Sequence, residues 1–340
     1  MIPIDRSQVF STQLSDAFAH VPTLAAVNVV TRQRSDPHPV QPISLHPSEP
    51  DGVWDTESSR TTGEATTPLA ASTSTTVRTK LDKVSDPKLE IKKEATAPNG
   101  LYGVNYSLSA PGAGLSNITF PISIDEGLQR KKAGDAGTFF AMQFGVNNQK
   151  GAPLARGYIG LQPRGDGKAL VVFSGFGPHF KAPQGRAEAD GGAGGSNSTL
   201  VDFKFGHKYN LTIEVDPTDP HRLKGFIQDV TDPDKPGSKQ HVKNLYVDQK
   251  VALAGRDTGF VEHYGARINR SSQIGTMSGS FAAPFTVDDK DNVRTGEIRS
   301  SGLYGRYKHS MVGNEELTKE SGKGKLLHFS FQGVGYQKKD

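Results

Sequence analysis

In the second two thirds of the chain, apolar and polar side chains alternate with a period of two, the pattern of half-buried β-strands. Residues 102–108 and 118–124 alternate in this way, whereas residues 139–146 and 169–173 are short and almost continuously apolar. Runs of the second kind are typical of strands covered on both faces, so we expect them to be central. Because Pro121 has no amide hydrogen, its strand is expected to lie at an edge or to carry a bulge.

Short connections between these runs predict antiparallel pairing of neighbours. The clearest hairpin is expected between residues 201–205 and 209–215, where a turn separates two strands with one apolar face each. A second turn leads into a strand over 223–230, and a last strand is expected over 325–331. Residues 315–320 predict at most one turn of helix.

Roughly a dozen short strands, separated by Gly, Pro and Asp turns, indicate an all-β fold class. We expect an antiparallel two-sheet sandwich or jelly-roll-like domain over residues 98–340. Residues 1–100 hold only three aromatic residues and three glycines, and they are crowded with Ser, Thr and Pro. Such a segment cannot bury enough apolar surface to offset its ordering entropy. Residues 1–97 are therefore predicted to be a disordered N-terminal segment that serves as linker or secretion leader.

The net charge of +4 is unevenly distributed, because residues 1–100 carry 10 Lys/Arg against 12 Asp/Glu and the remainder carries 30 against 24. A mildly basic domain favours anionic partners such as acidic polysaccharide, phospholipid or nucleic acid, although a solvated surface often has this balance. No fold signature of nucleic-acid binding accompanies the charge. The chain has no cysteine, which excludes disulfides, thiol catalysis and Cys-ligated metal.

No apolar run reaches the roughly 18–20 residues of a membrane-spanning helix. The apolar stretch over 17–30 is interrupted by His20, Pro22 and Asn28 and follows no basic region, so a cleaved signal peptide is not expected. The Ser/Thr-rich leader resembles in composition the uncleaved secretion signals of bacterial type III effectors. We expect either secretion without a cleaved signal peptide, for example by a type III-like route, or a cytoplasmic location.

Motifs for cofactors, metals and nucleophiles are not convincing. The glycine run Gly191–Gly195 leads into a strand and lacks the Lys-Ser/Thr and helix of a phosphate loop, so it is interpreted as a flexible loop. The histidines show no metal-ligand spacing, and no Gly-x-Ser-x-Gly occurs. No cofactor or metal is therefore expected. As a weak catalytic candidate Glu262 stands out, because Phe260, Val261, His263 and Tyr264 around it would desolvate a carboxyl.

Several segments follow one another in a recognisable order between about residues 100 and 335: Phe139–Val146, Gly157-Tyr-Ile-Gly-Leu-Gln162, Val171-Val-Phe-Ser174, the glycine run before Val201–Phe205 with Gly206-His-Lys-Tyr209, and Gly259-Phe-Val-Glu-His263. In this order the segments resemble the bacterial domain family DUF3472, a β-sandwich family of uncharacterised function. The resemblance implies a jelly-roll-like module of the kind attached to carbohydrate-active or cell-surface proteins. The chain departs from a typical sugar platform, since it holds a single tryptophan.

A ligand is expected where loops on a rigid sandwich bring polar and flat side chains together. The predicted ligand-binding residues are Gln162, Phe176, His179, Asn197, Glu262, His263 and Tyr264, close to the glycine run and to residues 175–180. The favoured function is a non-enzymatic binding module for carbohydrate or another cell-surface ligand. The alternatives are a secreted bacterial effector that acts through a host protein and a polysaccharide hydrolase or lyase that uses Glu262.

Overall fold

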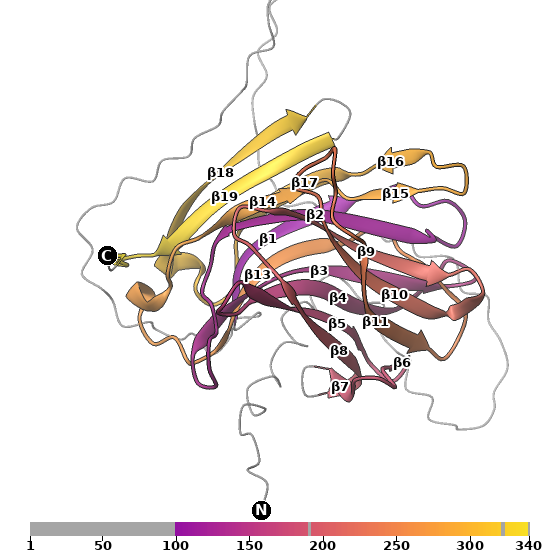
Figure 1. Ribbon diagram of the computed structural model, residues 1–340, viewed down its shortest axis with the longest axis horizontal. Helices are drawn as coiled ribbons and strands as arrows, with labels where there is room; N and C mark the ends of the chain where they lie inside the picture. Colours follow the sequence, from indigo (N-terminus) through magenta and orange to yellow (C-terminus); the bar gives the residue numbers. More distant parts are fainter. Residues whose placement is uncertain (1–98, 190–191, 321–323, 339–340) are drawn as a thin grey trace, which may run out of the picture. The chain divides into compact units, whose positions relative to one another are not determined.

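The structure is a computed structural model, and it describes residues 99–189, 192–320 and 324–338 (Figure 1). These residues form two antiparallel β-sheets packed face to face, so the all-β sandwich predicted from the alternation is confirmed. The predicted disordered segment 1–97 lies outside the described residues. Within them, no helix is long and apolar enough to cross a membrane.

The first sheet contains two of the long apolar strands at its centre. Its strands, in spatial order, are β17 (Glu297–Leu303), β1 (Gly100–Ser107), β13 (Thr258–Gly265), β3 (Ala136–Asn148), β4 (Pro153–Pro163), β5 (Lys168–Phe176), β8 (Gly192–Asp202) and β7 (Arg186–Ala189), and β12 (Val251–Leu253) extends the sheet along β3. The two runs expected to be central are β3 and β5, and both have neighbours on each side.

The second sheet packs over the first in Figure 1 and contains both strands of the last hairpin, β18 and β19. Its order is β18 (Met311–Glu320), β19 (Gly324–Gly333), β14 (Met277–Ala282), β2 (Asn117–Glu126), β9 (Lys208–Asp216), β10 (Asp219–Asp229), β11 (Gln240–Val247) and β6 (Phe180–Lys181), with the pair β15 (Phe285–Val287) and β16 (Val293–Thr295) beside β2. Two single-turn 3-10 helices, η2 (Ser271–Gln273) and η3 (Lys308–Ser310), lie between strands.

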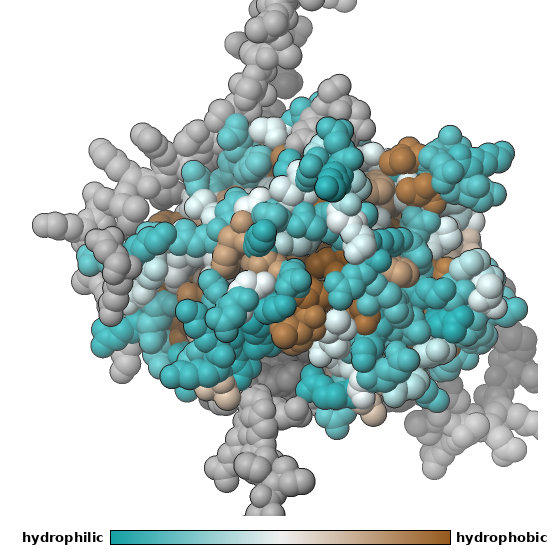
Figure 2. All heavy atoms as spheres, in the orientation of Figure 1, coloured by the Kyte–Doolittle hydropathy of each residue, from teal (hydrophilic) through white to brown (hydrophobic). Residues whose placement is uncertain are grey.

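One continuous core fills the space between the sheets. Alternate residues of the first sheet, such as Phe140, Phe144 and Phe173, meet alternate residues of the second, such as Phe120 and Phe281, and all five are fully buried. On the side of the molecule shown in Figure 2, the surface is mostly hydrophilic, with hydrophobic residues gathered near its middle. The residues that point inward in the two-residue alternation are therefore those that form the core.

Residues 201–205 and 209–215 do not pair, so the predicted hairpin is wrong. The first of them ends β8 in the first sheet, and the second is β9 in the second sheet. Phe203 stacks on Tyr209 with ring centroids 5.5 Å apart, and Gly206 turns the chain with a φ of +77°. The apolar faces that suggested a hairpin instead pack against each other as the chain crosses from sheet to sheet.

The strand with Pro121 is an interior strand and not an edge strand, but its pairing with β14 shifts register between Ile124 and Glu126, which fits the bulge expected as the alternative. β14 pairs with β2 as far as Ile122, and β15 takes over at Thr119. The missing amide hydrogen of Pro121 therefore falls where one neighbouring strand ends and the next begins. Residues 315–320 also differ from expectation, because they continue β18 and form no helical turn.

Candidate binding face on the first sheet

The first sheet has a second apolar cluster on its outer face, the side turned away from the core. The fully or nearly buried members are Phe139, Ala141, Tyr158, Val172 and Phe260, which alternate with core residues along β3, β4, β5 and β13. We call this the outer-face cluster. Three of its rings meet edge to face, since Phe139 lies 5.1 Å from Tyr158 and 5.7 Å from Phe260 between centroids.

Four half-buried side chains surround the outer-face cluster: Leu170, Phe176, Tyr264 and Tyr304. The ring of Phe176 meets Tyr158 edge to face at 5.2 Å. Tyr304 lies on Gly100, and Tyr264 lies on Gly137 in the neighbouring strand; a Cβ at either glycine would be within 2.6 Å of ring carbon atoms. The two glycines therefore let both tyrosine rings lie flat against the sheet.

Glu262 is on this face and is 2 % exposed. The hydroxyl of Tyr304 donates a hydrogen bond to Oε1 of Glu262 across 3.2 Å. Burial, together with the nearby carboxyl, raises the pKa of Tyr304 well above its usual value, so this phenol stays protonated. The carboxyl expected from sequence to be desolvated is indeed buried among aromatic rings.

The end of the face beside Tyr264 is cationic. The guanidinium carbons of Arg130 and Arg164 each lie 5.7 Å from the centre of the Tyr264 ring. Nη2 of Arg164 donates to Oε1 of Gln162 across 2.9 Å, which fixes the guanidinium beside the ring. Burial raises the pKa of Tyr264 to about 12, although both arginines act to lower it.

The opposite end of the face is held by hydrogen bonds between side chains. Nη1 of Arg156 donates to Oε1 of Gln143 across 3.1 Å, and the hydroxyls of Ser174 and Ser196 lie 2.8 Å apart. Phe176 belongs to this end, because it follows Leu170 by six residues along β5, or roughly 20 Å of extended strand. Glu262 and Phe176 thus share one face but lie at different ends of it.

The structure brings four of the seven predicted ligand-binding residues onto this face: Gln162, Phe176, Glu262 and Tyr264. Asn197 points into the sandwich, where its Nδ2 donates to the carbonyl oxygen of Asn244 in the other sheet across 2.8 Å. Asn197 is therefore not part of this face. A β8 side chain opposite Phe173 has to share the inward direction of that core residue.

His263 also points inward and does not belong to the face. Its Nε2 lies 3.5 Å from the hydroxyl of Tyr307, and its Nδ1 is buried with no hydrogen-bond partner. Burial, with a smaller contribution from Arg306, lowers the pKa of His263 to about 4. Because it stands between Glu262 and Tyr264 on one strand, it must face the other way.

His179 and the glycine run lie at the edge of the sandwich. Nδ1 of His179 is 2.9 Å from Oδ2 of Asp248, so it forms an ion pair there when protonated. Gly192–Gly195 begin β8 and pair with β5 and β7, in place of the expected flexible loop. Gly191 lies outside the described residues. Neither segment approaches Glu262.

The sequence analysis did not identify the residues that make the face cationic and aromatic, above all Arg130, Arg164 and the outer-face cluster. Arg130 lies in the connection before β3, and only the folded chain brings it to Tyr264. A signal was present for Tyr304, since the segment 304–309 mixes aromatic and cationic side chains. The described residues contain no group of three His, Asp or Glu side chains arranged to hold a metal ion.

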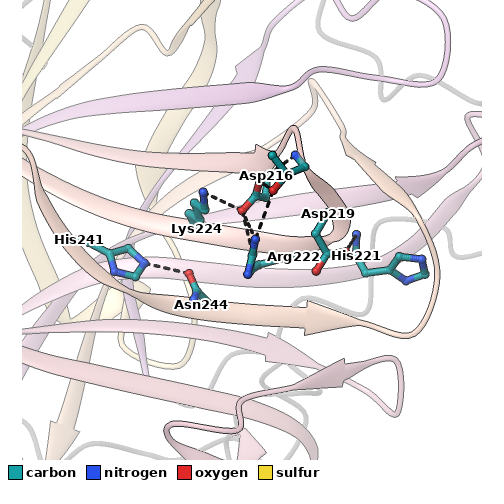
Figure 3. Close-up of polar contacts among 8 residues, drawn as sticks. Asp216, Asp219, His221, Arg222, Lys224, His241 and Asn244 are labelled. Atoms are coloured by element: carbon teal, nitrogen blue, oxygen red, sulfur yellow. Dashed lines mark hydrogen bonds and ion pairs between the residues drawn. The ribbon is translucent and has the colours of Figure 1, made fainter.

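A separate polar network lies on the second sheet, around the turn between β9 and β10 (Figure 3). Asp216 is 1 % exposed; its Oδ2 lies 2.7 Å from Nζ of Lys224 and accepts a hydrogen bond from Nε of Arg222 across 2.8 Å. Hydrogen bonds from Lys224 and Thr218 lower the pKa of Asp216 well below its usual range. Because each charge already has a partner, we interpret this network as one that stabilises the turn between β9 and β10.

Comparisons with known proteins identify no family. No protein-family model matches the chain, and no curated protein matches its sequence. Two solved structures of scytalido-glutamic peptidase, one with a peptide-based transition state analog and one with a transition state analog inhibitor, are similar at 11% and 10% identity and a TM-score of 0.34. The similarity covers 68% of this chain and 97% of the peptidase. A likeness this distant carries no argument about activity.

Proposed function

We propose that the β-sandwich is a non-enzymatic binding module for carbohydrate and that the sugar chain lies on the outer face of the first sheet. The observation that carries the proposal is that three half-buried aromatic rings, Phe176, Tyr264 and Tyr304, surround the buried outer-face cluster on that one face, with amide, carboxyl and guanidinium groups beside them. Apolar faces of a sugar ring pack on such side chains, while its hydroxyls require donors and acceptors beside them.

Hydrolysis of a glycan usually needs two carboxylates about 5–10 Å apart across the scissile bond. The buried acids of the described residues are Asp216, Asp257 and Glu262. Asp216 lies on the second sheet, and Asp257 precedes Glu262 by five residues, or roughly 17 Å of extended strand. The Oδ1 atom of Asp257 also accepts the amide hydrogen of Gly145 across 3.1 Å. This arrangement favours binding over cleavage.

The test is a glycan array of neutral and acidic oligosaccharides probed with the full chain, followed by calorimetry on the oligosaccharide retained. Phe176→Ala removes a half-buried ring from the face and is expected to weaken that oligosaccharide about tenfold. Phe226→Ala is the matched control, because Phe226 is a half-buried ring on the second sheet, beneath Lys239. Its affinity should equal that of the native chain.

Gln162→Ala gives the same test without removing an aromatic ring, and circular dichroism confirms that each variant is folded. An array that retains no oligosaccharide would overturn the proposal, as would equal losses in Phe176→Ala and Phe226→Ala. The membership in DUF3472 and the effector alternative stay predictions, and the latter concerns residues 1–97, which lie outside the described residues.

A second candidate function, a polysaccharide hydrolase or lyase, is favoured by one observation: Glu262 is a buried carboxyl on the proposed sugar face and is contacted by the Tyr304 hydroxyl. Release of new chain ends from an array-positive polysaccharide by the native chain, lost in Glu262→Gln while binding persists, would establish it. Binding without any release of chain ends would leave the binding module as the function.

A further inference from the structure

Tyr264, Arg130 and Arg164 form a cluster at one end of the outer face that the binding module alone does not explain. Each guanidinium carbon is 5.7 Å from the Tyr264 ring centre, so the two cations are at most twice that distance from each other. Like charges that share one aromatic ring repel each other, and an anion between them would relieve that repulsion. Among the described residues, neither arginine has a carboxylate within 4.0 Å.

The acidic groups near this end are already engaged elsewhere. Oδ2 of Asp135 accepts the amide hydrogen of Lys132, and Asp202 pairs with Lys168. Glu262 receives the hydroxyl of Tyr304. None of these three carboxylates forms an ion pair with Arg130 or Arg164.

The hydroxyl of Tyr264 adds a donor that lacks an acceptor. It is buried and has no hydrogen-bond partner. A buried polar group without a partner costs free energy, so such a group in a folded protein calls for an explanation. The phenol packs directly on Gly137, where the absence of a side chain makes room for the ring. A bound oxyanion would supply the missing acceptor.

We propose that this end of the face binds an anionic group of the carbohydrate, a uronate carboxylate or a sulfate ester, between Arg130 and Arg164, with the Tyr264 hydroxyl donating to the same group. The inference rests on the proposed function and narrows it to acidic sugars. Guanidinium groups suit this role because they donate paired hydrogen bonds to planar oxyanions. The hydrogen bond from Arg164 to Gln162 holds one of them in place before the sugar arrives.

Calorimetry of the full chain with oligogalacturonate and with its methyl ester tests the inference, since the two probes differ in charge and little in shape. The acid is expected to bind at least tenfold more tightly at low salt, and the preference should shrink as sodium chloride is added. Arg164→Gln and Arg130→Gln should bring the ratio of the two affinities close to one.

Arg156→Gln is the matched control, because Arg156 lies on the same strand as Gln162 and also donates to a glutamine, Gln143, but is not near Tyr264. It should leave the ratio of the affinities unchanged. Gly137→Ala provides a second variant: its new Cβ would displace the Tyr264 ring and should reduce the preference for the acid.

A sulfated oligosaccharide serves as a third probe. If it binds more tightly than oligogalacturonate, the proposed anion site is supported and its ligand group is a sulfate ester. Equal affinity for the acid, the ester and the sulfated probe would overturn the inference and leave the proposed function intact. An empty glycan array would overturn the proposed function and the inference together.

Discussion

The hydroxyl of Tyr304 reaches Oε1 of Glu262 across 3.2 Å, although the two residues are 42 positions apart in the chain. The phenol of Tyr264, two residues after Glu262 on β13, is buried without a hydrogen-bond partner. The same face thus holds one tyrosine hydroxyl that is satisfied and one that is not.

This contrast predicts that replacing each tyrosine by phenylalanine changes the free energy of unfolding differently. Tyr304→Phe should lower the free energy of unfolding by roughly 1–2 kcal/mol, because it removes a hydrogen bond to a buried carboxyl. Tyr264→Phe should be neutral or slightly stabilising, because it removes an unsatisfied buried hydroxyl. Urea unfolding of the two variants checks this, and equal losses of stability would contradict it.

Asp257 predicts a loss of stability as pH rises from about 4 to about 8. Burial raises its pKa to about 8, against small opposing contributions from the Gly145 amide and Arg156. Between its ordinary value of 3.8 and about 8, the folded chain therefore holds a proton that the unfolded chain has lost. Stability should fall as pH rises through this window, by on the order of 1 kcal/mol per pH unit. Asp257→Asn should flatten the decline in urea midpoints between pH 5 and pH 8, and parallel profiles would refute it.

His263 predicts the reverse dependence on the acid side. Its pKa is lowered from 6.5 to about 4 by burial, so between these values only the unfolded chain binds the proton. Stability contributed by the neutral imidazole is therefore present above about pH 6.5 and is lost as pH falls toward 4. His263→Gln should reduce the fall, on the order of 1 kcal/mol per pH unit, in denaturation midpoints between pH 6.5 and pH 4.5. His309→Gln, at an exposed position of η3, is the control and should retain the native profile.

The network around Asp216 predicts a stability role for one ion pair and none for another. Asp216→Asn leaves Arg222 and Lys224 without their shared carboxylate and should lower the melting temperature by several degrees. Asp202→Asn breaks the pair with Lys168, but the Asp202 side chain is 93% exposed, so the melting temperature should stay within error of the native value. A larger drop in Asp202→Asn than in Asp216→Asn would contradict the assignment.

The two-residue period was sufficient to predict the fold class, because alternate residues of β3 do face the core and the outer cluster. It did not predict which strands pair, since residues 201–205 and 209–215 carry apolar faces that fit either a hairpin or a crossing between sheets. Pairing depends on contacts between distant segments, and one sequence does not reveal them.

The sequence contained a signal that separates His263 from Glu262 and Tyr264. Glu262, His263 and Tyr264 are consecutive residues of one strand, and consecutive side chains of a strand point to opposite faces. Applied to residues 262–264, this alternation excludes His263 from the predicted ligand-binding residues and keeps Glu262 and Tyr264. Arg130 was beyond reach, because its position beside Tyr264 is set by a connection that only the tertiary structure places.

The strand order also has a consequence for how the chain is made. Val104 of β1 pairs with Gly259 and with Ser301, and β2 pairs with β14, so β1 finds both of its neighbours, and β2 one of them, more than 150 residues later. During synthesis on the ribosome neither sheet can close until most of the domain has emerged. Such long-range pairing is slow and leaves strand edges exposed in the meantime. The nascent chain should therefore depend on chaperones more than a meander of the same length would.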